Sequence, residues 1–150
     1  SYGKCPYYDE VYPHIQNIIS SDLRSLSELN IKLIKAFSTM LSLNTNFHMA
    51  SCMENITKDR VQRLVDICQI QKCSSYYSPA GSLDYLNTEK NKALFNSANI
   101  SIYFQQFEAI PYLQRGQDFE PRMSILDALM YCGSEKTKNI INQGSNVLKI

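Results

Sequence analysis

Apolar residues recur every three or four positions through the first third of the chain, which is the spacing of one buried face of an α-helix. From Tyr7 to about Ser20 this spacing predicts a first helix, in which Pro13 is tolerated only near the helix start. A second, longer helix is predicted from Asp22, as its N-cap, to about Leu43. Both helices therefore carry an apolar face that needs a packing partner.

Strand-like runs then alternate with helical stretches. In order, the pattern predicts a short strand centred on Phe47 to Ala50, a helix capped by Thr57, a strand at Ser74–Ser78, a helix from Ser82 to about Ser97 that Asn99 closes, a strand at Ile100–Phe107, a helix capped by Ser124 and stopped by Gly133, and a last short helix from Lys136 to about Gln143.

Strands separated by helices imply right-handed βαβ crossovers and a parallel sheet. We therefore expect a single α/β domain over residues 1–150, built as a three-layer parallel sheet flanked by helices. Three strands alone leave such a sheet open at both edges. Either the two N-terminal helices pack over it, or part of the sheet is missing from this chain.

The composition is that of an ordinary globular protein, with 44% hydrophobic and 19% charged residues in a chain of 150. A formal net charge of +1 gives no global field that would recruit nucleic acid, so no nucleic-acid partner is predicted. No apolar run approaches the roughly 18 residues that a membrane span needs. These features together exclude nucleic-acid binding by bulk charge and a membrane-spanning helix.

Five cysteines at irregular spacing form no C-x-x-C pair, and only His14 and His48 could complete a metal site with them. A zinc or redox centre is the alternative. We favour reduced, mostly buried thiols of a cytoplasmic protein, with no metal and no cofactor.

Ligands of open parallel sheets gather beyond the carboxyl ends of the strands. The corresponding segments here are Ser51 and Cys52, then Ser78 to Ser82, and finally the loop from Tyr112 to Met123. Gly81 before a Ser-capped helix could present backbone N–H groups to a phosphate or carboxylate. The more common alternative is that Ser82 simply caps its helix and Asp84 favours the helix dipole.

The other polar candidates have ordinary structural explanations as well. Ser124 and Asp127 invite a nucleophile interpretation, but Ser-x-x-Asp at a helix start is far more often a cap with a first-turn carboxylate. A lone strand histidine such as His48 is more often structural. The long loop, with its polar groups Tyr112, Gln114 and Arg115, is the best candidate for ligand contacts. On the helix that Thr57 caps, Arg60 and Arg63 either clamp an anion or are solvated side chains on one helix face.

Several segments in order along the chain resemble the WbqC-like family of bacterial proteins. Members of that family are longer, with further N-terminal strands that are absent here, and this chain begins at Ser1. The resemblance therefore implies a C-terminal portion that lacks strands present in the full-length family. The matching segments are SYGKCPYYDEVYP, RLVDIC, YYSPAGSLDYL, ISIYFQQF, YLQ and FEPRMSILDALMYCG.

The resemblance implies a role in bacterial surface-polysaccharide (O-antigen, lipopolysaccharide) biosynthesis and transfer of an aminoacyl (glycyl) group. A small-molecule or nucleotide-linked sugar ligand, or another phosphorylated small molecule, would bind at the strand ends. Gly81 and Ser82 would hold the anion, Tyr112 and Gln114 would contact the acceptor, and Asp84 or Asp127 would be the candidate base. The polar residues that match the family's motifs are Ser78, Gly81, Asp84, Tyr85, Tyr112, Gln114, Ser124 and Asp127. The alternative is a non-catalytic binding or scaffold module, which the lack of a Ser/His/Asp, Cys/His or metal constellation favours.

Overall fold

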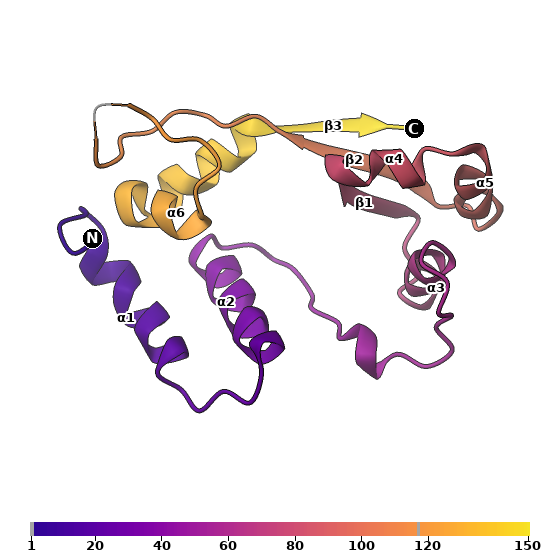
Figure 1. Cartoon of the computed structure of the whole chain (residues 1–150), viewed down its shortest axis with the longest axis horizontal. Coiled ribbons are helices and arrows are strands. Elements are labelled where there is room, and N and C mark those ends of the chain that lie inside the picture. The colour runs from indigo at the N-terminus through magenta and orange to yellow at the C-terminus, as the bar shows by residue number, and fades with distance from the viewer. Residues whose placement is uncertain (1, 117) are drawn as a thin grey trace. The chain divides into compact units, whose positions relative to one another are not determined.

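The computed structural model describes residues 2–116 and 118–150. By its contacts the chain divides into two compact units. Unit 1 comprises Ser1–Asn46 and Ala109–Gly144, and unit 2 comprises Phe47–Glu108 and Ser145–Ile150. The elements are α1 (Tyr8–Ile19), α2 (Leu26–Met40), the 3-10 helix η1 (Ala50–Cys52), α3 (Gln62–Ile70), β1 (Ser75–Pro79), the 3-10 helix η2 (Ala80–Ser82), α4 (Leu83–Leu86), α5 (Glu89–Ser97), β2 (Ser101–Phe107), α6 (Ile125–Gly144) and β3 (Ser145–Lys149), as Figure 1 shows.

Unit 1 is helical, and α1 and α2 were both predicted. The helix α2 begins later than expected, because Ser25 rather than Asp22 caps it. The Ser25 hydroxyl accepts the N–H of Glu28 at 3.2 Å, and the Glu28 carboxylate accepts the N–H of Arg24 at 3.1 Å. Two free N–H groups are thereby satisfied at the helix start. The core of this unit consists of Cys5, Val11, Ile15, Leu41, Leu129 and Met130.

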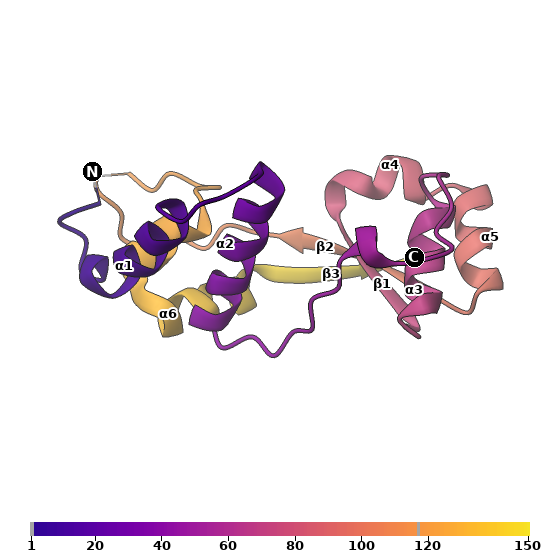
Figure 2. The same cartoon turned by 90° about the horizontal axis from the view of Figure 1, so that it is seen from below.

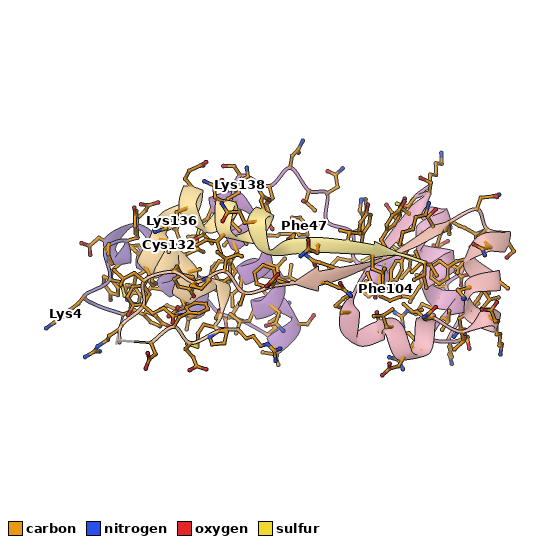
Figure 3. All side chains as sticks on the ribbon, turned by 90° about the horizontal axis from the view of Figure 1, so that it is seen from above. Lys4, Phe47, Phe104, Cys132, Lys136 and Lys138 are labelled. Atoms are coloured by element: carbon orange, nitrogen blue, oxygen red, sulfur yellow. The ribbon has the colours of Figure 1, made fainter. Side chains whose placement is uncertain are left out.

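The helix α6 is broken at Gly133, whose φ of 71° and ψ of 175° are not helical. The predicted helix that stops at Gly133 and the predicted last helix from Lys136 are therefore the two halves of α6, and Gly133 is the break between them. The carbonyl of Met130, just before the break, accepts the N–H of Tyr7 at 3.1 Å. Cys132 is buried at the same level of α6 (Figure 3).

Unit 2 contains an open three-stranded sheet in the order β1-β2-β3. β1 runs parallel to β2, with Tyr77 opposite Tyr103, whereas β3 runs antiparallel to β2, with Lys149 opposite Tyr103. The sheet is thus mixed, and the expected three-layer parallel sheet is not confirmed. The antiparallel strand β3 was missed by the prediction.

The strand expected at Phe47 to Ala50 is wrong. Phe47, which Figure 3 labels, and His48 lie in coil, and Ala50 opens the 3-10 helix η1. Ser51 and Cys52 consequently do not follow a strand. The helix expected from Ser82 to Ser97 is also interrupted, because Thr88 caps a separate helix by accepting the N–H of Asn91 at 3.3 Å.

One face of the sheet packs against the helices of unit 2. Ile102 and Phe104 are buried on β2, whereas Tyr103 between them and Gln105 point to the other face. Figure 2 shows α3, α4 and α5 grouped beside β1. The core of unit 2 consists of Val61, Val65, Cys68, Leu86, Phe95, Ile100, Ile102 and Phe104.

Within residues 2–116 and 118–150, no helix combines the length and the apolar character that crossing a membrane requires.

Candidate functional site

Three of the predicted residues meet at the start of α6. The Tyr112 hydroxyl donates to the Asp127 carboxylate at 2.7 Å, and the Gln114 side-chain N–H donates to the same oxygen at 2.9 Å. Asp127 is only 4% exposed, in the first turn of the helix. Ser124 precedes it, and its hydroxyl accepts the N–H of Leu126 at 3.3 Å, so Ser124 caps the helix start as predicted. Several donors therefore converge on one buried carboxylate, whose oxygens only accept hydrogen bonds.

Gln114 also closes the loop in which it lies. Its side-chain N–H donates to the carbonyl of Glu120 at 3.1 Å, and its side-chain carbonyl accepts the N–H of Glu120 at 2.7 Å. Tyr112 meets Phe119 edge to face, with 5.3 Å between ring centroids. The loop is therefore held together by Gln114 and attached to α6 through Asp127.

A cavity of about 410 Å³ lies elsewhere in unit 1, but a smaller one of about 210 Å³ opens directly onto Asp127. The rings of Tyr2 and Tyr131 form part of its wall and meet at 67°, with 6.3 Å between centroids. Tyr131 follows Asp127 by four residues on α6, a spacing that could have identified it from sequence. Glu120 lies in the predicted loop from Tyr112 to Met123 and Tyr2 in a family-matching segment, but neither was singled out as a site residue. The cavity is lined by Tyr2, Gln114, Arg115, Glu120, Met123, Asp127 and Tyr131.

The tyrosines near Asp127 have raised pKa values and keep their protons at neutral pH. Burial, followed by the hydrogen bond to Asp127, raises the pKa of Tyr112 above its ordinary value. The same two causes raise the pKa of Tyr2. For Tyr131, burial and then a hydrogen bond with Cys5 raise the pKa. These phenols are fixed donors at neutral pH and do not serve as bases.

The second group of predicted residues lies at the end of β1 in unit 2. Ser78 and Ser82, 3% and 5% exposed, share a hydrogen bond of 2.6 Å between their hydroxyls. The Ser82 hydroxyl also contacts the carbonyl of Pro79 at 2.6 Å and makes no capping bond to α4. The expected Ser82 cap is therefore absent, because the hydroxyl is engaged inside the turn. Gly81 is exposed, and a Cβ atom there would meet nothing within 4 Å.

The remaining candidates of unit 2 lie on the four-residue helix α4. Asp84 is exposed in the first turn of α4. The Arg60 guanidinium lies over the Tyr85 ring, 3.7 Å from the ring centroid, in a cation–π contact. A helix this short offers little dipole to an anion. A separate cavity of about 360 Å³ lies at the strand ends, lined by Tyr77, Ser78, Pro79, Gln105 and Val147.

The predicted residues thus divide between the units, and the shared cleft expected from strand topology stays a prediction. In the described part of the chain, no three His, Cys, Asp or Glu side chains are grouped so that they could hold a metal ion. Unit 2 holds Ser78, Gly81, Ser82, Asp84 and Tyr85, and unit 1 holds Tyr112, Gln114, Ser124 and Asp127.

Comparison with protein families settles the relationship that the sequence segments suggested. The profile of the WbqC-like protein family matches residues 1–139. The chain belongs to the WbqC-like protein family. Because the match covers nearly the whole of this WbqC-like chain, the expectation that it is a C-terminal portion is not borne out.

Among curated proteins, the chain is similar to the uncharacterized protein Rv1507c of Mycobacterium tuberculosis. The two are 24% identical over 137 residues, which cover 90% of this WbqC-like chain and 57% of that protein. The chain therefore spans little more than half the length of this relative. No solved structure matches.

Proposed function

We propose that this WbqC-like protein acts in the bacterial cytoplasm as a group transferase of surface-polysaccharide (O-antigen) biosynthesis, and that the cavity at Asp127 holds the amino group of an aminoacyl (glycyl) substrate. Family membership supports the first part. One observation supports the second: Asp127 is a buried carboxylate that, within the described residues, hydrogen-bonds only to neutral donors and forms no ion pair.

The charges around the cavity favour an ammonium group. Asp127 and Glu120 contribute two carboxylates to the lining, against one guanidinium from Arg115. A buried charge without an ionic partner gains most from an ion of opposite sign. Tyr2 and Tyr131 line the same cavity, and a ring face turned to the ligand would add a cation–π contribution, which is larger in a desolvated site.

The size of the cavity favours a small ligand group. Its volume of about 210 Å³ is below the roughly 300–1,000 Å³ of pockets that hold drug-sized molecules. An aminoacyl group such as glycyl fits this limit, with Arg115 available to its carbonyl or carboxylate oxygen. Transfer would depend on positioning and electrostatic stabilisation, with Asp127 orienting the amine.

The phosphorylated or nucleotide-linked partner is proposed to bind at the end of β1. Supporting this are the cavity of about 360 Å³ beside Ser78 and the open backbone at Gly81. The hydroxyls of Ser78 and Ser82 already bond to each other, so backbone N–H groups and Tyr85 are the better candidate contacts. Asp84 remains the proposed base in this unit.

Calorimetric titration of the full chain with glycine and with glycinamide tests the amine site, because glycinamide keeps the ammonium but lacks the carboxylate. We expect both to bind. Glu120→Gln should weaken both about tenfold, the loss of roughly 1.4 kcal/mol, whereas Arg115→Gln should weaken glycine alone. Glu54→Gln, an exposed carboxylate outside the cavity, is the matched control. If neither glycine nor glycinamide gives binding heat, the amine site is wrong.

A non-catalytic binding module is the second candidate. The observation that favours it is the internal satisfaction of Asp127 by Tyr112 and Gln114, which a purely structural carboxylate would also show. In that case neither amine binds, yet Asp127→Asn still lowers the stability of unit 1.

A further inference from the structure

The end of α3 brings two cysteines together in unit 2. After the helix ends, Lys72 adopts the left-handed conformation with φ of 54°, and the chain folds back. The N–H of Cys73 then donates to the carbonyl of Cys68 at 2.8 Å. This bond spans six residues and is the 6→1 bond of a Schellman motif, in which the residues at its two ends frequently pack against each other. In the present structure the Cys73 thiol donates to the carbonyl of Gln71 at 3.7 Å.

The hydrogen bond limits the distance between the two Cα atoms. Standard geometry places a Cα about 2.4 Å from its own carbonyl oxygen and about 1.5 Å from its own nitrogen. With 2.8 Å between nitrogen and oxygen, the Cα atoms of Cys68 and Cys73 cannot lie more than about 6.7 Å apart. Disulfides require roughly 4.4–6.8 Å. The Cα separation is therefore within the range of a disulfide, and the Cys73 side chain would have to leave the Gln71 carbonyl and turn towards Cys68.

The two thiols differ in exposure, and this difference sets the order in which they react. Cys73 is exposed at the surface, whereas Cys68 is 6% exposed and belongs to the core of unit 2. Burial, and then the neighbouring Cys73, raise the pKa of Cys68 above its ordinary value. Only Cys73 is accessible to a reagent from solution, so it reacts first.

We propose that Cys68 and Cys73 are a reversible disulfide site, oxidised by a low-molecular-weight disulfide such as oxidised glutathione. The Cys73 thiolate attacks one sulfur of the reagent, forming a mixed disulfide and releasing one glutathione thiolate, which takes up the Cys73 proton. The Cys68 thiolate then attacks the Cys73 sulfur and breaks the Cys73–glutathione bond. This forms the Cys68–Cys73 bond and releases the second glutathione as a thiolate, which takes up the Cys68 proton. Two thiols are oxidised and one disulfide is reduced.

Oxidation would close a six-residue ring at the joint between α3 and β1. All five cysteines are free thiols in the structure, so the site is proposed as one that responds to a change in redox conditions. The proposal does not depend on the function assigned to the cavity at Asp127, since every residue it uses lies in unit 2.

Peptide mass spectrometry of the full chain, incubated with oxidised glutathione and alkylated, tests the proposal. Trypsin cleaves after Lys72 and puts the two cysteines on different peptides, so the disulfide appears as a cross-linked pair that dithiothreitol separates. We expect this pair in the natural chain and in Cys52→Ser, and its loss in Cys73→Ser with Cys68 left reduced. A stable glutathione adduct on Cys73 with Cys68 still alkylated, or a Cys52–Cys73 cross-link, would overturn it.

Discussion

A Cβ atom built on Gly133 would lie 2.5 Å from the Cε1 atom of the Tyr7 ring, closer than real side chains approach. The same glycine has φ of 71° and ψ of 175°, a conformation that is almost confined to glycine. Two independent constraints therefore fix the residue type at the break in α6. We predict that Gly133→Ala lowers the free energy of unfolding by about 1–3 kcal/mol, measured by urea denaturation.

Gly81→Ala is the matched control, because nothing lies within 4 Å of its Cβ position and its φ is not left-handed. It should change stability by no more than about 0.5 kcal/mol. Tyr7→Ala in the Gly133→Ala background should recover only the contact part of the loss, since the backbone strain remains. Full recovery would show that the ring contact alone matters.

The loop that Gln114 closes gives a second prediction. Gln114→Ala removes the acceptor of the Glu120 N–H, so this amide should exchange with deuterium about tenfold to a hundredfold faster, which corresponds to a loss of roughly 1–3 kcal/mol in local stability. Gln16→Ala, an exposed glutamine of α1, serves as the control and should leave the exchange unchanged. Unaltered exchange at Glu120 in Gln114→Ala would mean that the loop is held by other contacts.

The buried hydroxyl pair of unit 2 can be tested by a double-mutant cycle. Because the Ser82 hydroxyl donates to the Pro79 carbonyl, the Ser78 hydroxyl is the donor of the pair. Ser82→Ala leaves the Ser78 hydroxyl and the Pro79 carbonyl without this partner and should cost about 1–2 kcal/mol, whereas Ser78→Ala keeps the bond to Pro79 and should cost about 1 kcal/mol. The double variant should cost less than the sum of the two, because it removes both partners. Ser97→Ala, exposed on α5, should lie within about 0.5 kcal/mol of the natural chain. If the loss of stability in the double variant equals the sum of the two single losses, the two hydroxyls are not coupled, contrary to what their 2.6 Å contact implies.

The raised pKa values of Tyr2 and Tyr112 predict loss of stability in alkali. In the unfolded chain a tyrosine gives up its proton near pH 10, while the folded protein keeps it, so the unfolded state binds fewer protons above that pH. Their contribution to stability is complete below about pH 10 and is lost as the pH rises towards the folded pKa values. Tyr112→Phe should start about 1 kcal/mol less stable and fall less steeply between about pH 9 and 11.5. The measurement is the urea midpoint of both proteins across this pH range. If Tyr112 is not responsible, the midpoints of Tyr112→Phe and of the natural chain will fall with pH at the same rate.

The sequence predicted elements well wherever a buried face repeats. Ile102 and Phe104 alternate with Tyr103 on β2, and Val11 and Ile15 are one turn apart on α1, so periodicity identified both. The strand expected at Phe47 failed because, among the described residues, no strand pairs with this segment, and propensity alone does not form a strand. β3 was missed for the opposite reason. Four of its five residues are exposed, so it shows no alternation, and pairing with β2 alone defines it.

The candidate site was predicted only in part. Family resemblance and loop position together selected Tyr112, Gln114 and Asp127, and the structure brings these three into one hydrogen-bonded group. Tyr2 and Glu120 were not selected, although they lie in a family-matching segment and in the predicted loop. Their places in the cavity wall follow from tertiary packing and from a loop closure that is not visible in the sequence pattern. The Thr88 cap was visible as Asn-Thr-Glu before a helical stretch and could have been recognised.

The register of β3 has a consequence for biosynthesis. Gln105 of β2 meets Ser145 across an interval of 40 residues, all of which must leave the ribosome before the sheet gains its third strand. Until then β2 presents an unpaired edge beside the exposed Phe107, which is the kind of surface on which nascent chains stick to one another or to chaperones. Slow synthesis of β3 would therefore lengthen the time during which this chain is prone to aggregate.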